Sequence, residues 1–396
     1  MEQFRIKELK EIYTKELLEN VMPFWEKYAP DYKYGGMLHY MERDGSLYCT
    51  DKSGWFQGRG TWTFSKLYNN VEKRPEWLEI ARLGYEFLVR RCFDTDGRMF
   101  FELTRDGRPI RKRRYWFTEA FAVSAMSEYY KASGDREALC RAKELFEQIV
   151  GYYKNPESLP QKYITENFQI KSHNMRMVLV STAQNLMEAE YDPVYEDMIH
   201  LVITELFRDF VKEDKRALLE CIAIDGSYLD TPLGRRINPG HSMETAWFVL
   251  REAERTGDRE LIERTGKLIK WSMDWGWDEQ YGGIFNYVDL EGKPSDKIEW
   301  DMKYWWTHAE ALYANLYAYY LTGDPVFEEN YEKLHSYTFS HFPDYEYGEW
   351  FGYLHRDGTL CLSAKGTMWK GPFHIPRTLI YGIELLEKME HGGAVS

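Results

Sequence analysis

His241 and Glu244 stand three residues apart in the segment Gly234–Leu250 (GRRINPGHSMETAWFVL). Residues at this spacing lie on one face of a helix, so the imidazole and the carboxylate can act on the same ligand. A Pro-Gly pair just before His241 marks a loop, and Asn238 or Ser242 can cap the helix that follows. An isolated histidine at a helix terminus is more often structural than catalytic. This one becomes a candidate because the same kind of junction recurs along the chain.

Five other segments place aromatic and polar residues together where a helix is predicted to begin. They are 55–62 (WFQGRGTW, with Arg59), 115–119 (YWFTE), 172–176 (SHNMR, with Asn174), 304–310 (YWWTHAE, with His308 and Glu310) and 371–377 (GPFHIPR, with His374). Histidine, glutamate and arginine beside tryptophan are the composition of a polar pocket with aromatic walls.

An internal period of about sixty residues indicates how these segments are arranged. Acidic-Gly turns between aromatic or alternating segments predict short β-hairpins at 44–45, 106–107, 225–226, 291–292 and 357–358. The glycines of these turns are 62, 119, 66 and 66 residues apart, and 119 is close to two periods. One hairpin is therefore expected to be missing or replaced near residues 155–169.

Helical patterns lie between these hairpins and a second set of turns, of which Gly134-Asp135, Gly257-Asp258 and Gly323-Asp324 are typical. The predicted helices are Phe4–Tyr28, Ser53–Val71, Glu76–Cys92, Trp116–Ala132, Arg136–Tyr153, Ser172–Glu190, Val194–Val211, His241–Thr256, Arg259–Trp275, Lys303–Leu321, Val326–His341 and Gly371–Met389. Six helical pairs in one chain favour an all-α fold, an (α/α)6 barrel formed by residues 1–396 as a single catalytic domain, and an open solenoid is the alternative.

In the closed barrel every inner helix follows a hairpin loop, so all six polar segments meet at one end. Two histidines from different helices, each beside acidic residues, suit proton abstraction and return on opposite faces of a carbon acid. Helix N-termini facing the pocket favour a developing oxyanion such as an enediolate. Glu244 and Glu310 could instead serve as the carboxylate pair of a glycoside hydrolase. A third alternative is a barrel that binds a sugar or a protein partner without catalysis.

Composition narrows the classes of partner. The net charge is −13 and the only dense basic cluster is Arg111–Arg114 (RKRR), which argues against a nucleic-acid or anionic-membrane partner. Five scattered cysteines without a Cys-x-x-Cys pair predict no metal site and fit a reducing cytosol. We also expect no signal peptide and no membrane-spanning segment. Aromatic residues make up 16% of the chain, which suits the binding of sugar rings.

Four stretches of the chain resemble the N-acylglucosamine 2-epimerases, also called renin-binding proteins. They are Gly54–Leu67 (GWFQGRGTWTFSKL), Gly234–Leu250, Glu299–Ala314 (EWDMKYWWTHAEALYA) and Asp344–Arg377, which contains DYEYGEWFGYLHRDGTL and KGPFHIPR. The resemblance implies an (α/α)6 barrel that interconverts N-acetyl-D-glucosamine and N-acetyl-D-mannosamine. It also implies ring opening, loss of the C2 proton to form an enediolate, and reprotonation on the other face.

By position, the resemblance implies His241 and His374 as the acid/base pair. The residues implied to hold the sugar or orient the histidines are Arg59, Asn174, Glu244, Trp247, Trp306, His308, Glu310 and Arg377. Arg59 is the candidate for neutralising the enediolate oxygen. No cofactor is implied for the chemistry itself, and a homodimer in the cytoplasm is expected.

Two departures from the family pattern leave alternatives open. The expected Trp-Trp-Pro-His is Trp305-Trp306-Thr307-His308 here, and the Gly-rich approach to the last helix is AKGTMWKG at 364–371. Some family members need ATP as an allosteric activator that is not consumed, and the altered loop leaves that dependence open. Cellobiose 2-epimerases and mannose-type aldose-ketose isomerases share the barrel and the two histidines, so the exact sugar and the carbon that receives the proton also stay open.

Overall fold

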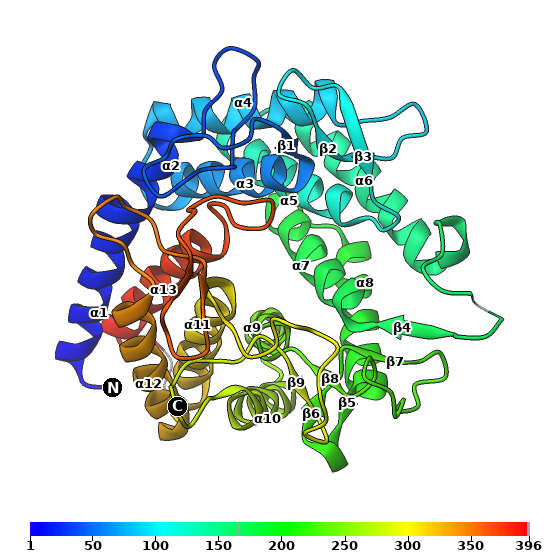
Figure 1. Ribbon diagram of the computed structural model, residues 1–396, viewed down its shortest axis with the longest axis vertical. Helices are drawn as coiled ribbons and strands as arrows, with labels where there is room; N and C mark the ends of the chain where they lie inside the picture. Colours follow the sequence, from blue (N-terminus) through cyan, green and yellow to red (C-terminus); the bar gives the residue numbers. More distant parts are fainter. Residues whose placement is uncertain (165, 394–396) are drawn as a thin grey trace.

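Six helices form a closed inner ring in the computed structural model, which describes residues 1–164 and 166–393. They are α3 (Gly54–Asn70), α5 (Phe117–Ser133), α7 (His173–Ala189), α9 (Pro239–Thr256), α11 (Trp305–Thr322) and α13 (His374–Glu390). Each packs against the next, and α13 packs against α3 (Figure 1). The predicted (α/α)6 barrel is therefore confirmed, and the open solenoid is not formed.

The outer helices pair with the inner ones in chain order. They are α4 (Pro75–Arg91), α6 (Arg136–Lys154), α8 (Pro193–Glu205), α10 (Arg259–Gly276) and α12 (Pro325–His341), while the N-terminal α1 (Gln3–Lys15) packs on α13. The helix expected at Phe4–Tyr28 passes through a π-helical stretch, η1 (Glu16–Val21), before α2 (Met22–Tyr28), and α8 likewise continues into the π-helix η3 (Leu206–Phe210). No helix in the described ranges has the length and apolar character that crossing a bilayer requires.

The Gly-Asp turns work as the sequence predicts. Gly134, Gly257 and Gly323 end inner helices in the left-handed conformation, which glycine adopts at little cost. The aspartates that follow cap the next outer helices; the Asp258 carboxylate, for example, accepts a hydrogen bond from the Leu261 N–H. A large apolar core fills the space between the two rings of helices.

Short strands connect neighbouring units at the end of the barrel where the inner helices begin. Their bounds are β1 (Lys52–Ser53), β2 (Phe100–Leu103), β3 (Pro109–Lys112), β4 (Ile170–Ser172), β5 (Val211–Lys212), β6 (Ala217–Leu218), β7 (Cys221–Ala223), β8 (Arg236–Ile237), β9 (Val288–Asp289), β10 (Lys303–Tyr304), β11 (Tyr353–Leu354) and β12 (Leu360–Leu362). The strand just before an inner helix pairs with a strand of the next unit in β1–β2, β4–β7, β8–β9 and β10–β11.

The hairpin prediction is correct at two of its five positions. The turns at 106–107 and 357–358 join the hairpins β2–β3 and β11–β12. The turn at 44–45 is flanked only by an isolated bridge, and the strands next to 225–226 and 291–292 pair with other units instead of folding back. Between 155 and 169 the described residues form a short 3-10 helix, η2 (Pro156–Ser158), and no strand.

Buried ion pairs repeat at this end and join one unit to the next. In each, an aspartate contacts a fully buried lysine and the arginine of an Arg-Asp-Gly turn from the neighbouring unit. The three clusters are Asp31–Lys52–Arg105, Asp278–Lys303–Arg356 and Asp344–Lys365–Arg43, with Lys–Asp distances of 2.8, 3.1 and 2.9 Å. The third cluster joins the last unit to the first and so closes the ring of loops.

We expect Asp278→Asn to lower the free energy of unfolding by about 3 kcal/mol, because it leaves the buried Lys303 ammonium without its counter-charge. Urea unfolding followed by circular dichroism measures this change. Asp274→Asn is the matched control: Asp274 and its partner Arg216 are exposed, so its cost should stay below about 0.5 kcal/mol. Equal costs for the two substitutions would contradict the role given to the buried cluster.

Candidate active site

Glu310 connects three inner helices in the middle of the candidate site. Its carboxylate accepts hydrogen bonds from Nε1 of Trp247 and from an NH2 of Arg377, both at 2.7 Å, and lies 2.7 Å from Nδ1 of His374. Glu310 is fully buried. Because the carboxylate accepts from Nδ1, the proton of a neutral His374 is held there and Nε2 presents its lone pair.

A second carboxylate orients His241. Both oxygens of Glu220 lie 3.1 Å from Nδ1 of His241, and one lies 3.4 Å from Nδ1 of His173. His173 also contacts the hydroxyl of Thr245 at 2.7 Å. The backbone N–H of His241 donates to the side chain of Asn238, so Asn238 is the cap that fixes the start of α9.

Trp306 lies beside both histidines. The centre of its indole is 5.1 Å from the imidazole of His241 and 5.7 Å from that of His374. This approach requires a glycine on α9, because a Cβ at Gly240 would meet the Trp306 ring at 2.6 Å. The Pro-Gly pair before His241 therefore makes room for the aromatic wall as well as marking the loop.

Arg59 supplies a cation with few partners. Its guanidinium lies 4.3 Å from the ring of Phe121 and 5.3 Å from that of Phe373, and one NH group donates to the Trp369 carbonyl at 3.4 Å. Its Nε is buried without a hydrogen-bond partner among the described residues. Burial lowers the pKa of Arg59 to about 10, so the group still carries its charge at neutral pH.

The surroundings shift the pKa values of the two histidines in opposite directions. Burial lowers the pKa of His374 well below its ordinary value, and the cations of Arg377 and Arg59 add to the effect. Burial also lowers the pKa of His241, but the Glu220 carboxylate outweighs it, and the net pKa is raised. Near neutral pH this favours a neutral His374, able to accept a proton, and a protonated His241, able to donate one.

The structure brings most of the predicted site residues together but leaves His308 apart. Nδ1 of His308 lies 2.7 Å from the Tyr304 carbonyl, and Nε2 accepts from the backbone N–H of Ile284 at 2.9 Å. Both ring nitrogens are used, the side chain is fully buried, and burial lowers its pKa to about 3. His308 supports a loop and is not free to hold a ligand.

Two predicted segments contribute differently from the rest. Asn174 begins α7 half-buried beside His173, and its side-chain oxygen accepts from the Ser172 hydroxyl. Glu119, in the segment 115–119, is bound by Arg98 at 2.6 Å and by backbone, so α5 supplies aromatic residues instead of a charge.

Sequence reasoning missed Glu220 and His173 as partners of His241. Glu220 lies between β6 and β7, outside the first turns of the inner helices, where the candidate residues were predicted. His173 was visible as part of the polar segment 172–176, but no spacing rule connects it to His241. The only sequence signal for Glu220 is an acidic residue just before an apolar strand. This pattern is too common in proteins to identify a site residue.

The carboxylates of Glu244 and Glu310 also have to be considered for metal binding and for glycoside hydrolysis. Oxygens of Glu244 and Glu310 and a nitrogen of His374 all lie within 4.8 Å of one another, a spacing compatible with a metal ion. One NH2 of Arg377 already donates to both carboxylates, so a cation would have to displace a guanidinium. Glu310 holds three donors, which suits it to orient His374 and not to protonate a glycosidic oxygen.

Comparison with known proteins gives consistent results. The family model described as N-acylglucosamine 2-epimerase (GlcNAc 2-epimerase) matches residues 36–375. The N-acylglucosamine 2-epimerase of Mus musculus is 36% identical over 370 residues, 91% of this chain and 88% of that protein. That of Bos taurus is 36% identical over 396 residues, 98% of this chain and 93% of that protein. Among solved structures, the cellobiose 2-epimerase of Bacillus thermoamylovorans has a TM-score of 0.85 at 23% identity, covering 96% and 99% of the two chains, which shows the shared fold.

We expect the imidazole of His241 to titrate above the ordinary histidine pKa, and Glu220→Gln to lower that pKa because it removes the carboxylate that stabilises the charged form. NMR of protein with 13C-labelled histidine, assigned with His241→Ala, measures the titration. Glu213→Gln, at an exposed position of the same loop, is the control and should leave the curve unchanged. An unchanged His241 titration in Glu220→Gln would contradict the assignment.

Proposed function

The chain belongs to the N-acylglucosamine 2-epimerase family, and we propose that it inverts C2 of an N-acylated amino sugar, interconverting N-acetyl-D-glucosamine and N-acetyl-D-mannosamine. The observation that supports this most directly is the pair of histidines beside Trp306, each oriented by its own carboxylate. Inversion at one carbon needs a base on one face and an acid on the other, and we assign these two roles to the two histidines.

The charge states suggest the order of proton transfers. After the sugar ring opens, Nε2 of neutral His374 takes the C2 proton, and the electron pair of the broken C–H bond forms an enolate with the aldehyde carbonyl at C1, while the N-acyl nitrogen stays on C2. Protonated His241 then returns a proton to C2 from the opposite face. The reaction leaves His374 protonated and His241 neutral, which is the state required for the reverse direction.

The negative oxygen of the enolate needs a stabilising charge. Arg59 offers one, because its partly buried guanidinium has an Nε without a partner among the described residues and only a long hydrogen bond to a backbone carbonyl. A cation already in place inside a water-poor pocket stabilises a developing oxyanion more than it would in water. We assign Arg59 this role.

The other pocket residues are proposed to position the reacting groups. Glu310 and Glu220 hold the histidines, and Trp247 and Arg377 hold Glu310. Trp306 offers a flat face to the sugar, and Asn174 and Glu244 are placed to bind its hydroxyl groups. His308, expected earlier among the sugar ligands, is left out because both its nitrogens are bound to backbone.

We propose that these side chains perform the chemistry without a cofactor and that ATP, if it acts on this enzyme, acts as an activator that is not consumed. The altered loop at 364–371 contains Trp369, whose carbonyl binds Arg59, so a ligand at this loop would affect the oxyanion site. A homodimer in the cytoplasm is the proposed state. The five cysteines are all free thiols, which suits a reducing compartment.

We expect N-acetylmannosamine incubated with the enzyme in D2O to give N-acetylglucosamine carrying deuterium at C2, because the proton is lost to the protein and returned from solvent. Proton NMR, with and without ATP, follows the reaction. His241→Ala and His374→Ala should each lower the rate by about 10²–10⁴-fold. His355→Ala, at an exposed position in the β11–β12 hairpin, is the control and should keep the wild-type rate.

The same spectra separate the alternatives. Appearance of a ketose would favour an aldose-ketose isomerase, and activity on cellobiose, glucose or mannose alone would favour the related epimerases and isomerases. No exchange into N-acetylmannosamine under either condition would refute the proposed substrate. Full activity of His374→Ala would refute the two-histidine mechanism.

A further inference from the structure

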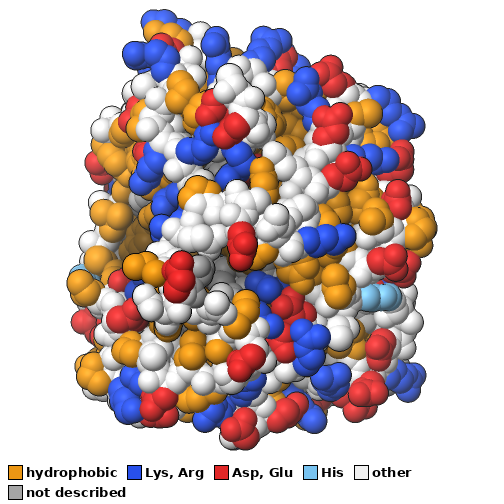
Figure 2. Space-filling view, turned by 90° about the vertical axis from the view of Figure 1, so that its right-hand side faces the viewer, with side chains coloured by type: hydrophobic (Ala, Val, Ile, Leu, Met, Phe, Trp, Pro, Cys, Tyr) orange, Lys and Arg blue, Asp and Glu red, His pale blue; other side chains and the backbone are white. Residues whose placement is uncertain are grey.

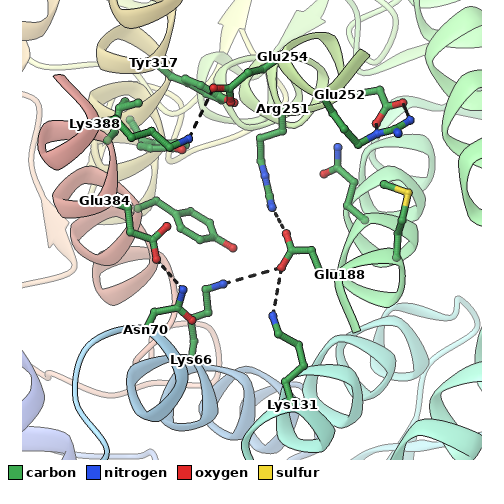
Figure 3. A pocket seen from close by; sticks show the side chains of 16 residues that line it. Lys66, Asn70, Lys131, Glu188, Arg251, Glu252, Glu254, Tyr317, Glu384 and Lys388 are labelled. Atoms are coloured by element: carbon green, nitrogen blue, oxygen red, sulfur yellow. Dashed lines mark hydrogen bonds and ion pairs between the residues drawn. The ribbon is translucent and has the colours of Figure 1, made fainter. Parts of the chain in front are cut away.

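A second cavity of about 500 Å³ lies at the opposite end of the barrel from the histidines (Figure 3). Its lining comes from all six inner helices and includes Lys66 of α3, Lys131 of α5, Glu188 of α7, Arg251 of α9, Tyr313 of α11 and Tyr381 of α13. The histidines occupy the first turns of their helices, whereas these charged residues lie toward the C-terminal ends. The volume is that of a small-molecule site.

Charged side chains converge inside this cavity. Figure 3 shows Lys66, Lys131 and Arg251 directed at the single carboxylate of Glu188. Lys131 also binds Glu128 at 3.0 Å. The Lys66 side chain is only 5% exposed, lies 3.9 Å from Glu188, and donates no hydrogen bond to any described residue. Glu188 is the nearest carboxylate to this ammonium but accepts no hydrogen bond from it, so the three N–H donors of Lys66 are available to a ligand.

Three cations, Lys66, Lys131 and Arg251, lie around the two carboxylates of Glu188 and Glu128, which leaves one cation in excess in this part of the cavity. Elsewhere in the lining Glu254 is bound by Tyr317 and lies 3.6 Å from Lys388, and Glu384 accepts from Asn70 at 2.8 Å. Figure 2 shows basic and acidic side chains interspersed on one outer face of the molecule. The excess beside Glu188 matches a small anion better than the several charges of a triphosphate.

The same cavity contains uncharged polar groups without a partner, which could form hydrogen bonds with hydroxyl groups of a ligand. Gln184 is buried, its side-chain nitrogen donates to the Phe248 carbonyl, and its Oε1 has no partner among the described residues. The hydroxyls of Tyr313 and Tyr381 likewise make no hydrogen bond within the described chain, although both side chains are more than nine-tenths buried. The two rings, 5.6 Å apart, offer apolar faces of the kind that sugars stack on.

The position of the cavity at the C-terminal ends of six helices does not by itself explain the charged and polar side chains that line it. The six C-termini carry partial negative charge, which accounts for cations in the last turns. It does not account for Gln184, whose free oxygen adds a further acceptor to the same region. We propose that the cavity binds a small hydroxylated anion, a sugar acid or a sugar phosphate, with its anionic group at Lys66 and Arg251 and its hydroxyl groups at Gln184, Tyr313 and Tyr381.

The floor of this cavity is also the back of the candidate active site. The indole of Trp247 lies 5.2 Å from the ring of Tyr313 and 5.8 Å from that of Tyr381, and its N–H binds Glu310, which holds His374. A ligand that moves either tyrosine therefore acts on the residue that orients the proposed base. The binding site itself does not depend on the proposed reaction.

Isothermal titration calorimetry with gluconate and with glucose 6-phosphate tests the proposal, and neutral glucose is the control ligand. We expect either anion to bind the wild-type protein and Lys66→Gln to weaken that binding at least tenfold. Lys270→Gln, which removes a lysine on the outside of the barrel, should bind as the wild type does. Binding of gluconate alone would identify a sugar-acid site, and binding of glucose 6-phosphate alone a phosphate site.

The wild-type protein provides a second measurement in case Lys66→Gln does not fold. Met187 lines this cavity, whereas Met368 contacts Arg111 in the loop beside the active site. With 13C-methyl methionine, assigned by Met187→Leu and Met368→Leu, the anion should shift the Met187 signal and not that of Met368. A shift of Met368 alone, binding unaffected by Lys66→Gln, equal binding of glucose, or no binding at millimolar concentrations would each overturn the proposal.

Discussion

The hydrogen bonds of one buried carboxylate, Glu310, determine the geometry of the proposed catalytic centre. Glu310 lies on α11, and its partners Trp247, His374 and Arg377 lie on α9 and α13, so three of the six inner helices meet at a single ionised group. An ionised carboxylate without these donors would be costly at such depth. The helices must therefore keep their register for the charge to remain satisfied, and the orientation of His374 follows from that register.

The loops around this centre depend on a different kind of contact. Short strands and buried Asp–Lys–Arg clusters connect several of the units to their neighbours. The strand just before such an inner helix is thus held by the unit that follows in the ring.

Much of the architecture could be predicted because it rests on local rules. A glycine that ends a helix and an aspartate that caps the next one act within a few residues, so the turns at 134–135, 257–258 and 323–324 and the helices beside them followed from sequence. The roles of His308 and Glu220 did not follow, because each depends on partners brought close only by the fold. A histidine in a polar segment looks the same whether its nitrogens face a pocket or a backbone carbonyl.

Closure of the ring has a consequence for the way the protein is made. Arg43 pairs with Asp344, Met41 pairs with Gly366, and the N-terminal α1 packs on α13. The first unit therefore lacks one of its two neighbours until α12, α13 and the loop between them have been synthesised. Until then the apolar surface that packs on α13 is exposed. His374 arrives with that final helix. The nascent chain is therefore an open arc for most of its synthesis, and it lacks the proposed base until α13 is added.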